Sequence, residues 1–287
     1  MITMQYNHMR YPEGRAKAVT LSYDDGTRHD MRFVETINRY GLKCTFNLTG
    51  NGVDNGMTMT RDYIKENMLG KGHEIATHGY FHRAQDLIRP IEGIREVIDS
   101  RIALERAFEM IIRGMAYPDR GIDRIARPEV SERIRSYLSE LDVEYCRSCG
   151  GDHDRFELPD DWLFWMPNAH HDNPKVMEYI DRFLAIDVDS MYKASRTPKL
   201  FFLWGHSFEF NSKDNWDHLE EICEKLSGKD DIWYATNMEI CEYAKAYASL
   251  VYSADGTRVY NPTLFDIWFD IDKKMYCIRS GETVILE

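Results

Sequence analysis

Residues 19–30 read VTLSYDDGTRHD, and this stretch decides how the rest of the chain is interpreted. An apolar run from Val19 to Tyr23 ends in two adjacent acids, Asp24 and Asp25, which are followed by a glycine. A short, continuous apolar run bounded by a turn signal is typical of a strand that is buried on both faces. The two carboxylates therefore stand where a buried strand is predicted to end.

Short apolar runs alternate with amphipathic stretches along most of the chain. The runs lie at residues 18–23, 43–48, 73–77, 114–117, 143–147, 163–167, 199–204 and 232–236. The amphipathic stretches lie at 29–40, 60–70, 91–112, 129–140, 174–188, 215–227 and 237–249. Strands alternating with helices indicate parallel strands joined by right-handed crossovers. Seven or eight such units over about 240 residues predict an α/β fold of the TIM-like (β/α) barrel type. A doubly wound open sheet is the alternative, although DDGTRHD is not the glycine fingerprint typical of that fold.

The pattern changes near residue 250. Residues 1–250 are assigned to the barrel, whereas residues 251–287 alternate apolar and polar side chains over short distances. Turn signals separate these short runs at Asp255-Gly256, Asp272-Lys273 and Ser280-Gly281. The pattern predicts three short antiparallel strands. Because so small a unit is not stable alone, we expect it to pack against the barrel as an appendage.

The bulk composition argues against some classes of partner. The 287 residues carry a formal net charge of −12, which disfavours a nucleic-acid backbone or an anionic membrane as the main partner. No window has the uninterrupted apolar length of a membrane span, and the N-terminal residues do not resemble a secretory signal, so we expect a cytoplasmic protein. The six cysteines are expected to be reduced. The composition predicts no oligomeric state.

Histidines follow three other predicted strands, as the acids follow the first. They are His78 and His82 after the third run, His170 and His171 after the sixth, and His206 after the seventh. The spacing of His78 and His82 lets both rings reach one point. In a parallel barrel all of these side chains project from the same C-terminal rim. One aspartate and two histidines are a familiar catalytic zinc set, which leaves a fourth position open for water.

The order and spacing of these motifs resemble the polysaccharide deacetylase family, the NodB-homology group of metal-dependent carbohydrate esterases. The first family motif, T-F-D-D-G, matches residues 22–26. The second, H-[ST]-x-x-H, matches residues 78–82 with glycine in place of the small hydroxyl residue. The last motif, an apolar strand that ends in histidine, matches residues 200–206, so that the resemblance covers residues 25–210.

The resemblance implies a deformed (β/α) barrel that binds one divalent ion, with Zn²⁺ as the first choice and Co²⁺, Ni²⁺ or Mn²⁺ as alternatives. Asp25, His78 and His82 correspond to the metal ligands of the family, Asp24 to its general base and His206 to its general acid. The implied reaction is the removal of an acetyl group from an N- or O-acetylated sugar or glycoconjugate by hydrolysis.

The third family motif, R-P-P-Y, is altered in this chain. In GMAYPDRG, residues 114–121, Ala116 stands where the family has an arginine that holds the catalytic aspartate. Arg120 lies four residues later and is the candidate substitute; without a nearby cation the pKa of Asp24 would be less depressed. A backbone N–H near Tyr117 is the expected donor to the oxyanion of the reaction.

Four further residues are candidates for contacts with the substrate or with the catalytic groups. They are His170, His171, Trp204 and Glu209. One of the two adjacent histidines is placed beside the metal or the acetyl group, unless both lie in a polar loop. Glu209 either orients His206, binds a sugar hydroxyl or is an ordinary surface glutamate. Trp204 either stacks on a sugar or fills the barrel.

Two other functions are open for a chain with this resemblance. A metal-independent hydrolase of a small amide or ureide would be expected to lack part of the ligand set. A non-catalytic carbohydrate-binding barrel would be expected to lack the base or the ligands. The chain keeps all of these residues, which favours the deacetylase, while the altered third motif leaves the binding barrel as an alternative.

Overall fold

A sheet of parallel strands forms the centre of the computed structural model, which describes residues 6–56, 59–122 and 125–286. Its strands are β2 (Lys17–Asp24), β3 (Cys44–Leu48), β4 (Glu74–Thr77), β5 (Gly114–Ala116), β6 (Tyr145–Arg147), β7 (Ala169–His170), β8 (Lys199–Gly205) and β9 (Ile232–Tyr234). They lie in the order β6-β5-β4-β3-β2-β8-β7, and β9 also pairs with β2. The alternation of strands and helices therefore produces the parallel sheet that it predicted.

Strand β2 is the centre of this sheet because three strands pair with it. β8 pairs with residues 17–23, β9 with residues 17–19 and β3 with residues 21–24, all of them in parallel. All eight residues of β2 are buried. A strand that is paired along both edges and covered on both faces has no solvated side, which explains its continuous apolar run.

Residues 165–170 bring the two ends of the sheet toward each other. Trp165 forms a single parallel bridge with Arg147 at the end of β6, while β7 pairs with β8. The prediction of a strand at 163–167 is wrong. Residues 162–164 form a 3₁₀ turn that the Asp161 side chain caps, and Pro167 has no N–H to donate to a neighbouring strand. The sheet thus curls into the deformed barrel that the resemblance implied.

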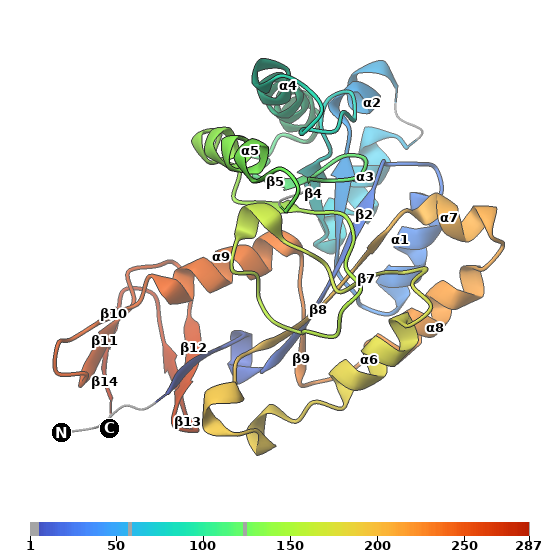
Figure 1. Ribbon diagram of the computed structural model, residues 1–287. Coiled ribbons are helices and arrows are strands. Elements are labelled where there is room, and N and C mark those ends of the chain that lie inside the picture. The colour runs from blue at the N-terminus through green and yellow to red at the C-terminus, as the bar shows by residue number, and fades with distance from the viewer. Residues whose placement is uncertain (1–5, 57–58, 123–124, 287) are drawn as a thin grey trace.

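Helices cover the outside of the sheet (Figure 1). They are α1 (Asp30–Arg39), α2 (Gly50–Asn55), α3 (Arg61–Asn67), α4 (Pro90–Phe108), α5 (Pro128–Glu140), α6 (Val176–Leu184), α7 (Ser207–Ser212), α8 (Trp216–Leu226) and α9 (Asn237–Ala248). The amphipathic pattern predicts all of these except α2 and α7, which have six residues each. Within the described part of the chain, no helix has the length and apolar character needed to cross a lipid bilayer.

Residues 251–286 form five strands, where the sequence predicts three. β10 (Val251–Tyr252), β11 (Arg258–Tyr260) and β14 (Thr283–Ile285) make one antiparallel sheet. β12 (Ile267–Ile271) and β13 (Lys274–Ile278) make a second sheet together with β1 (Asn7–Arg10). Figure 1 shows both small sheets beside α9, to one side of the parallel sheet. Strand β1, which the sequence does not predict, ties the start of the barrel segment to the appendage.

A buried group of charges holds the second small sheet to the barrel. Arg10 of β1 forms an ion pair with Asp270 of β12, and Arg196 Nη1 donates to Asp270 Oδ1 at 3.0 Å. Arg196 lies shortly before β8, and all three side chains are buried. One carboxylate therefore joins two arginines from the barrel segment to the C-terminal strands.

Candidate active site

The carboxyl ends of β2, β4 and β8 bring the predicted catalytic side chains together. Asp25, His78 and His82 each offer one ligand atom, and the three atoms lie within 4.8 Å of one another. His82 Nε2 is 3.6 Å and His78 Nε2 is 3.8 Å from Asp25 Oδ1. Tetrahedral zinc with bonds of 2.0–2.2 Å separates its ligand atoms by about 3.4 Å. The three side chains are therefore spaced as ligands of a single small cation.

The hydrogen bond of His78 leaves its other ring nitrogen available for an ion. His78 Nδ1 lies 2.9 Å from the carbonyl oxygen of Ala116, which can only accept, so Nδ1 carries the proton and Nε2 keeps its lone pair. Burial lowers the pKa of His78, although Asp24 and Asp25 act in the opposite direction. Neutral imidazole and carboxylate ligands fit a divalent transition metal, so the residues present suit the ion that the resemblance implies.

Left-handed backbone conformations set the direction of two of these side chains, those of Asp25 and His82. Asp25 has φ = 78° and His82 has φ = 58°, a region that few residues with a Cβ adopt. Because the chain leaves the extended conformation at Asp25, the adjacent carboxylates point in different directions. The side chain of Asp24 is 1% exposed and that of Asp25 is 30% exposed. One acid therefore lies in the core at the end of β2, and the other faces the two histidines.

Asp24 is held by residues from β3 and β6. Asn47 Nδ2 donates to Asp24 Oδ1 at 2.8 Å, and Arg147 Nη2 donates to Asp24 Oδ2. Burial by itself raises the pKa of Asp24, but Arg147, His78, His206 and the Asn47 hydrogen bond outweigh burial and lower it below its ordinary value. Asp24 is therefore a carboxylate at neutral pH.

Arg120 does not take the place of the missing third-motif arginine. Its Nη2 donates instead to Asp86 at 2.7 Å. The cation beside Asp24 comes from β6, because Ala116 at the end of β5 pairs in register with Arg147 at the end of β6. An arginine from either strand end can reach the same carboxylate. The sequence analysis missed Arg147, although an arginine that ends the predicted strand 143–147 was the available signal.

Tyr117 is not a free oxyanion donor in this structure. Its backbone N–H donates to the carbonyl oxygen of Arg147 at 2.9 Å and is thereby engaged in the pairing of neighbouring strands. Its side chain is buried, and the hydroxyl donates to the carbonyl oxygen of Leu163 at 2.9 Å. Tyr117 therefore packs the rim of the barrel.

His206 faces the two acids with one ring nitrogen and Glu209 with the other. Nε2 lies 3.9 Å from Asp24 Oδ2 and 4.0 Å from Asp25 Oδ2, and Nδ1 lies 3.4 Å from Glu209 Oε2. Glu209 also accepts the backbone N–H of His206 at 3.1 Å, which fixes this carboxylate beside the ring. Burial lowers the pKa of His206, but Glu209, Asp24 and Asp25 outweigh burial and raise it. His206 is therefore placed to donate a proton.

The adjacent histidines at the end of β7 contact the same oxygen of Glu209 as His206 does. His170 Nε2 is 3.1 Å and His171 Nε2 is 3.4 Å from Glu209 Oε2. Neither belongs to the group of Asp25 and its two histidines. They surround the carboxylate that contacts the general-acid candidate.

Trp204 covers the arginine that binds Asp24. The guanidinium of Arg147 lies over its ring, 4.5 Å from the centroid, and Trp204 Nε1 donates to the carbonyl oxygen of Gly150 at 2.9 Å. A cation stacked on an indole and paired with a carboxylate is held in place from two sides. Trp204 therefore restricts the position of Arg147.

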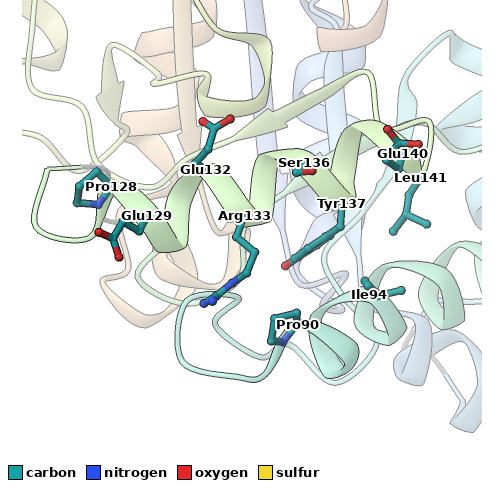
Figure 2. A pocket seen from close by; sticks show the side chains of 10 residues that line it. All are labelled: Pro90, Ile94, Pro128, Glu129, Glu132, Arg133, Ser136, Tyr137, Glu140 and Leu141. Carbon is teal, nitrogen blue, oxygen red and sulfur yellow. The ribbon is translucent and has the colours of Figure 1, made fainter.

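A hollow of about 280 Å³ opens beside Asp25, between the β2–α1 turn and α2. A larger groove of about 1060 Å³ lies between α4 and α5, where Figure 2 shows Arg133 and Tyr137 pointing toward Pro90 and Ile94. The groove shares no lining residue with the Asp25 group. Of the two spaces, the hollow is the one that Asp25 lines.

Comparisons with known proteins bear on the family and the fold. Residues 11–143 match the family described as polysaccharide deacetylase. None of the curated proteins matches the chain in sequence. A putative polysaccharide deacetylase from Mycobacterium smegmatis has a similar structure, with 17% identity and a TM-score of 0.58 over 85% of this chain and 96% of that chain.

Two further structures share the fold. The Xyl-CE4 domain of a multidomain xylanase from the hindgut metagenome of Trinervitermes trinervoides has 16% identity and a TM-score of 0.50, over 80% of this chain and 92% of that chain. A mutant of a CE4 family pseudoenzyme with restored enzymatic activity has 12% identity and a TM-score of 0.50, over 82% of this chain and 70% of that chain. The structural likeness extends over most of the chain, and over residues 11–143 the protein matches the polysaccharide deacetylase family, which confirms the resemblance that its motifs indicate.

Proposed function

We propose that the protein is a metal-dependent hydrolase that removes acetyl groups from an N- or O-acetylated carbohydrate. The observation that carries the proposal is the convergence of Asp25, His78 and His82 beside an ionised buried carboxylate, Asp24, and a histidine whose pKa is raised, His206. The family match over residues 11–143 supports the class of reaction.

Each of these residues has a role that follows from its position. Asp25, His78 and His82 would hold a divalent ion, which would supply a Lewis acid able to polarise an acetyl carbonyl and to acidify water. Asp24, ionised and 3.7 Å from His78 Nε2, accepts the proton of the attacking water. His206, whose Nε2 lies 3.9 Å from Asp24 Oδ2 and 4.0 Å from Asp25 Oδ2, donates a proton to the departing amine or hydroxyl.

The supporting residues keep these proton-transfer groups in their working states. Arg147 and Asn47 bind both oxygens of Asp24, which keeps it ionised and fixes its direction. Glu209 contacts His206 Nδ1, which stabilises the protonated ring and turns Nε2 toward the reaction centre. Zn²⁺ is the first choice for the ion, since two imidazoles and one carboxylate with an open position are a common catalytic zinc set.

The fold by itself does not require catalysis. One of the structures that resemble this chain is a mutant of a pseudoenzyme. What favours an active enzyme here is that the ligands, the base and the acid candidate are all retained and lie within reach of one another.

Acetate release from a panel of acetylated sugars tests the proposal. Asp24→Asn keeps the size of the side chain but removes the base, so we expect kcat to fall by about 10²–10⁴-fold while bound metal is retained. His78→Ala should lose both metal and activity. Asp62→Asn, an exposed carboxylate of α3, is the matched control and should behave as the wild type. Unchanged acetate release by Asp24→Asn would show that Asp24 is not the base.

A further inference from the structure

A second group of potential metal ligands lies next to the proposed active site. It consists of His170, His171, Asp172 and Glu209, whose ligand atoms all lie within 4.8 Å of one another. The first three follow one another at the end of β7, and Glu209 lies in α7, which follows β8. None of the four belongs to the proposed Asp25 centre.

His171 carries the inference because its Nε2 is buried and makes no hydrogen bond within the described part of the chain. The side chain is 0% exposed, and Nε2 lies 3.4 Å from Asp172 Oδ2 and 3.4 Å from Glu209 Oε2. Tyr23 Oη lies 3.3 Å from Nδ1 and can accept the proton of that nitrogen, which leaves a lone pair on Nε2. A buried nitrogen without a hydrogen bond is rare in native proteins. A lone pair that faces two carboxylates is satisfied by a cation.

The ring of His171 is held in this orientation from several sides. Phe210 stacks on it with ring centroids 4.1 Å apart, and Tyr23 stacks with centroids 5.7 Å apart and planes 4° from parallel. Gly205 makes room for the ring, since a Cβ at that position would lie 1.9 Å from His171 Nδ1. Ligands whose rotamers are fixed by packing are typical of built metal sites.

The charges around His171 also suit a cation. Asp172 and Glu209 contribute two carboxylates, and the ammonium group of Lys213 forms an ion pair with Asp172 Oδ2. The Lys213 side chain is 51% exposed, so it can move into solvent when another cation takes its place. Lys213 is therefore a competitor for the same carboxylate oxygen.

We propose that His170, His171, Asp172 and Glu209 bind a second divalent transition-metal ion. Two imidazoles and two carboxylates are a ligand set that suits Zn²⁺, and also Mn²⁺ or Fe²⁺. An ion at this place fixes the position of Glu209, which also lies 3.4 Å from His206 Nδ1. This second site goes beyond the proposed deacetylase reaction, because binding there requires neither Asp25 nor an acetylated substrate.

Counting ions per chain separates the two sites. The full chain is equilibrated with zinc at a buffered free concentration, separated from excess zinc and measured by elemental analysis. We expect two ions in the wild type, one in His78→Ala, one in Asp172→Asn and none in the double variant. Cobalt in place of zinc gives a second readout, since each four-coordinate site adds its own visible absorption.

The outcomes distinguish this proposal from the deacetylase centre. If the wild type binds a single ion, and this ion is kept in Asp172→Asn but lost in His78→Ala, the second site is overturned and the first is left intact. If this single ion is instead lost in Asp172→Asn and kept in His78→Ala, the result supports the second site and overturns the metal part of the proposed function. A wild type that binds no ion overturns both.

Lys213→Met provides an independent test that does not remove a ligand. Loss of the competing ammonium should tighten the second ion about 5-fold, which corresponds to the upper range for an exposed ion pair. Lys225→Met is the matched control, because Lys225 pairs with Asp181 of α6 and not with the ligand group. Equal zinc affinity in Lys213→Met and Lys225→Met would contradict the proposal.

Discussion

At the scale of single residues, the ion pair of Asp24 and Arg147 shows how a buried carboxylate stays ionised. Both side chains are buried, and burial alone disfavours the charged form of each. The pair offsets this cost only because Asn47 also donates to Asp24 and Trp204 lies against the guanidinium. Removal of one partner leaves an uncompensated buried charge, which costs about 3–5 kcal/mol.

We therefore expect Arg147→Met to move the acidic limb of the kcat/KM profile to higher pH. Without the guanidinium, burial dominates and the pKa of Asp24 rises, so the base is lost to protonation at a higher pH than in the wild type. The free energy of unfolding should also fall. The stability that the low pKa of Asp24 contributes is present above the pKa of the unfolded chain and is lost as the pH falls through the folded value.

Rates measured from about pH 4, near the ordinary pKa of an aspartate, to about pH 8, above that of imidazole, check this expectation. Arg120→Lys is the control, since Arg120 pairs with Asp86 and its profile should match the wild type. An acidic limb that stays in place in Arg147→Met would mean that Arg147 does not set the pKa of Asp24.

At the scale of elements, the turn after β4 positions both histidine ligands. Gly79 in this turn has φ = 75°, and a Cβ there would lie 2.9 Å from Glu96 Oε2. Glu96 accepts the backbone N–H of Phe81 at 2.8 Å and so holds the segment between His78 and His82. This contact explains why glycine replaces the small hydroxyl residue of the second family motif.

Gly79→Ala is expected to weaken zinc binding by about 10–100-fold, the usual effect of disturbing groups that support metal ligands. The new methyl group must displace Glu96, which shifts the turn that carries the two histidines. Gly41→Ala is the matched control, because Gly41 also has a positive φ of 67° but no atom of the described residues lies within 4 Å of its added Cβ.

Both glycine variants should lose about 1–2 kcal/mol of stability from the left-handed backbone. Only Gly79→Ala should lose metal affinity, as measured by competition with a zinc chelator. Equal zinc affinity in the two variants would show that the contact with Glu96 does not position the ligands.

At the scale of the whole molecule, Asp270 joins the C-terminal strands to the barrel. It is the shared partner of Arg10 and Arg196, and all three side chains are buried. Replacement of one carboxylate therefore leaves two buried guanidinium groups without their main counter-charge.

Asp270→Asn should lower the free energy of unfolding by about 3–5 kcal/mol, as measured by denaturant titration. Asp189→Asn is the control. Asp189 also pairs with Arg196 but is 86% exposed, so its loss should cost at most about 1 kcal/mol. Similar losses in the two variants would indicate that the buried pairs do not hold the C-terminal strands in place.

Elements with a long periodic pattern were predicted from the sequence, and short ones were not. The amphipathic period indicates α4 and α5, whereas α2 and α7 have six residues, too few for a helical period to be recognised. Strand β1 has four residues and depends on β12, which lies at the other end of the chain. Its pairing with β12 is a long-range contact, which a local sequence pattern does not indicate.

The sequence by itself determined the parallel sheet and the five side chains Asp24, Asp25, His78, His82 and His206. Four of them end or directly follow a strand whose apolar pattern is local, and His82 stands four positions after His78. Only the tertiary structure decided which cation serves Asp24 and what surrounds Glu209. Arg147 is 123 positions from Asp24 in the chain, and His170 ends strand β7 whereas Glu209 lies in helix α7. Strand order and register bring such residues together, and both are set by packing of the whole barrel.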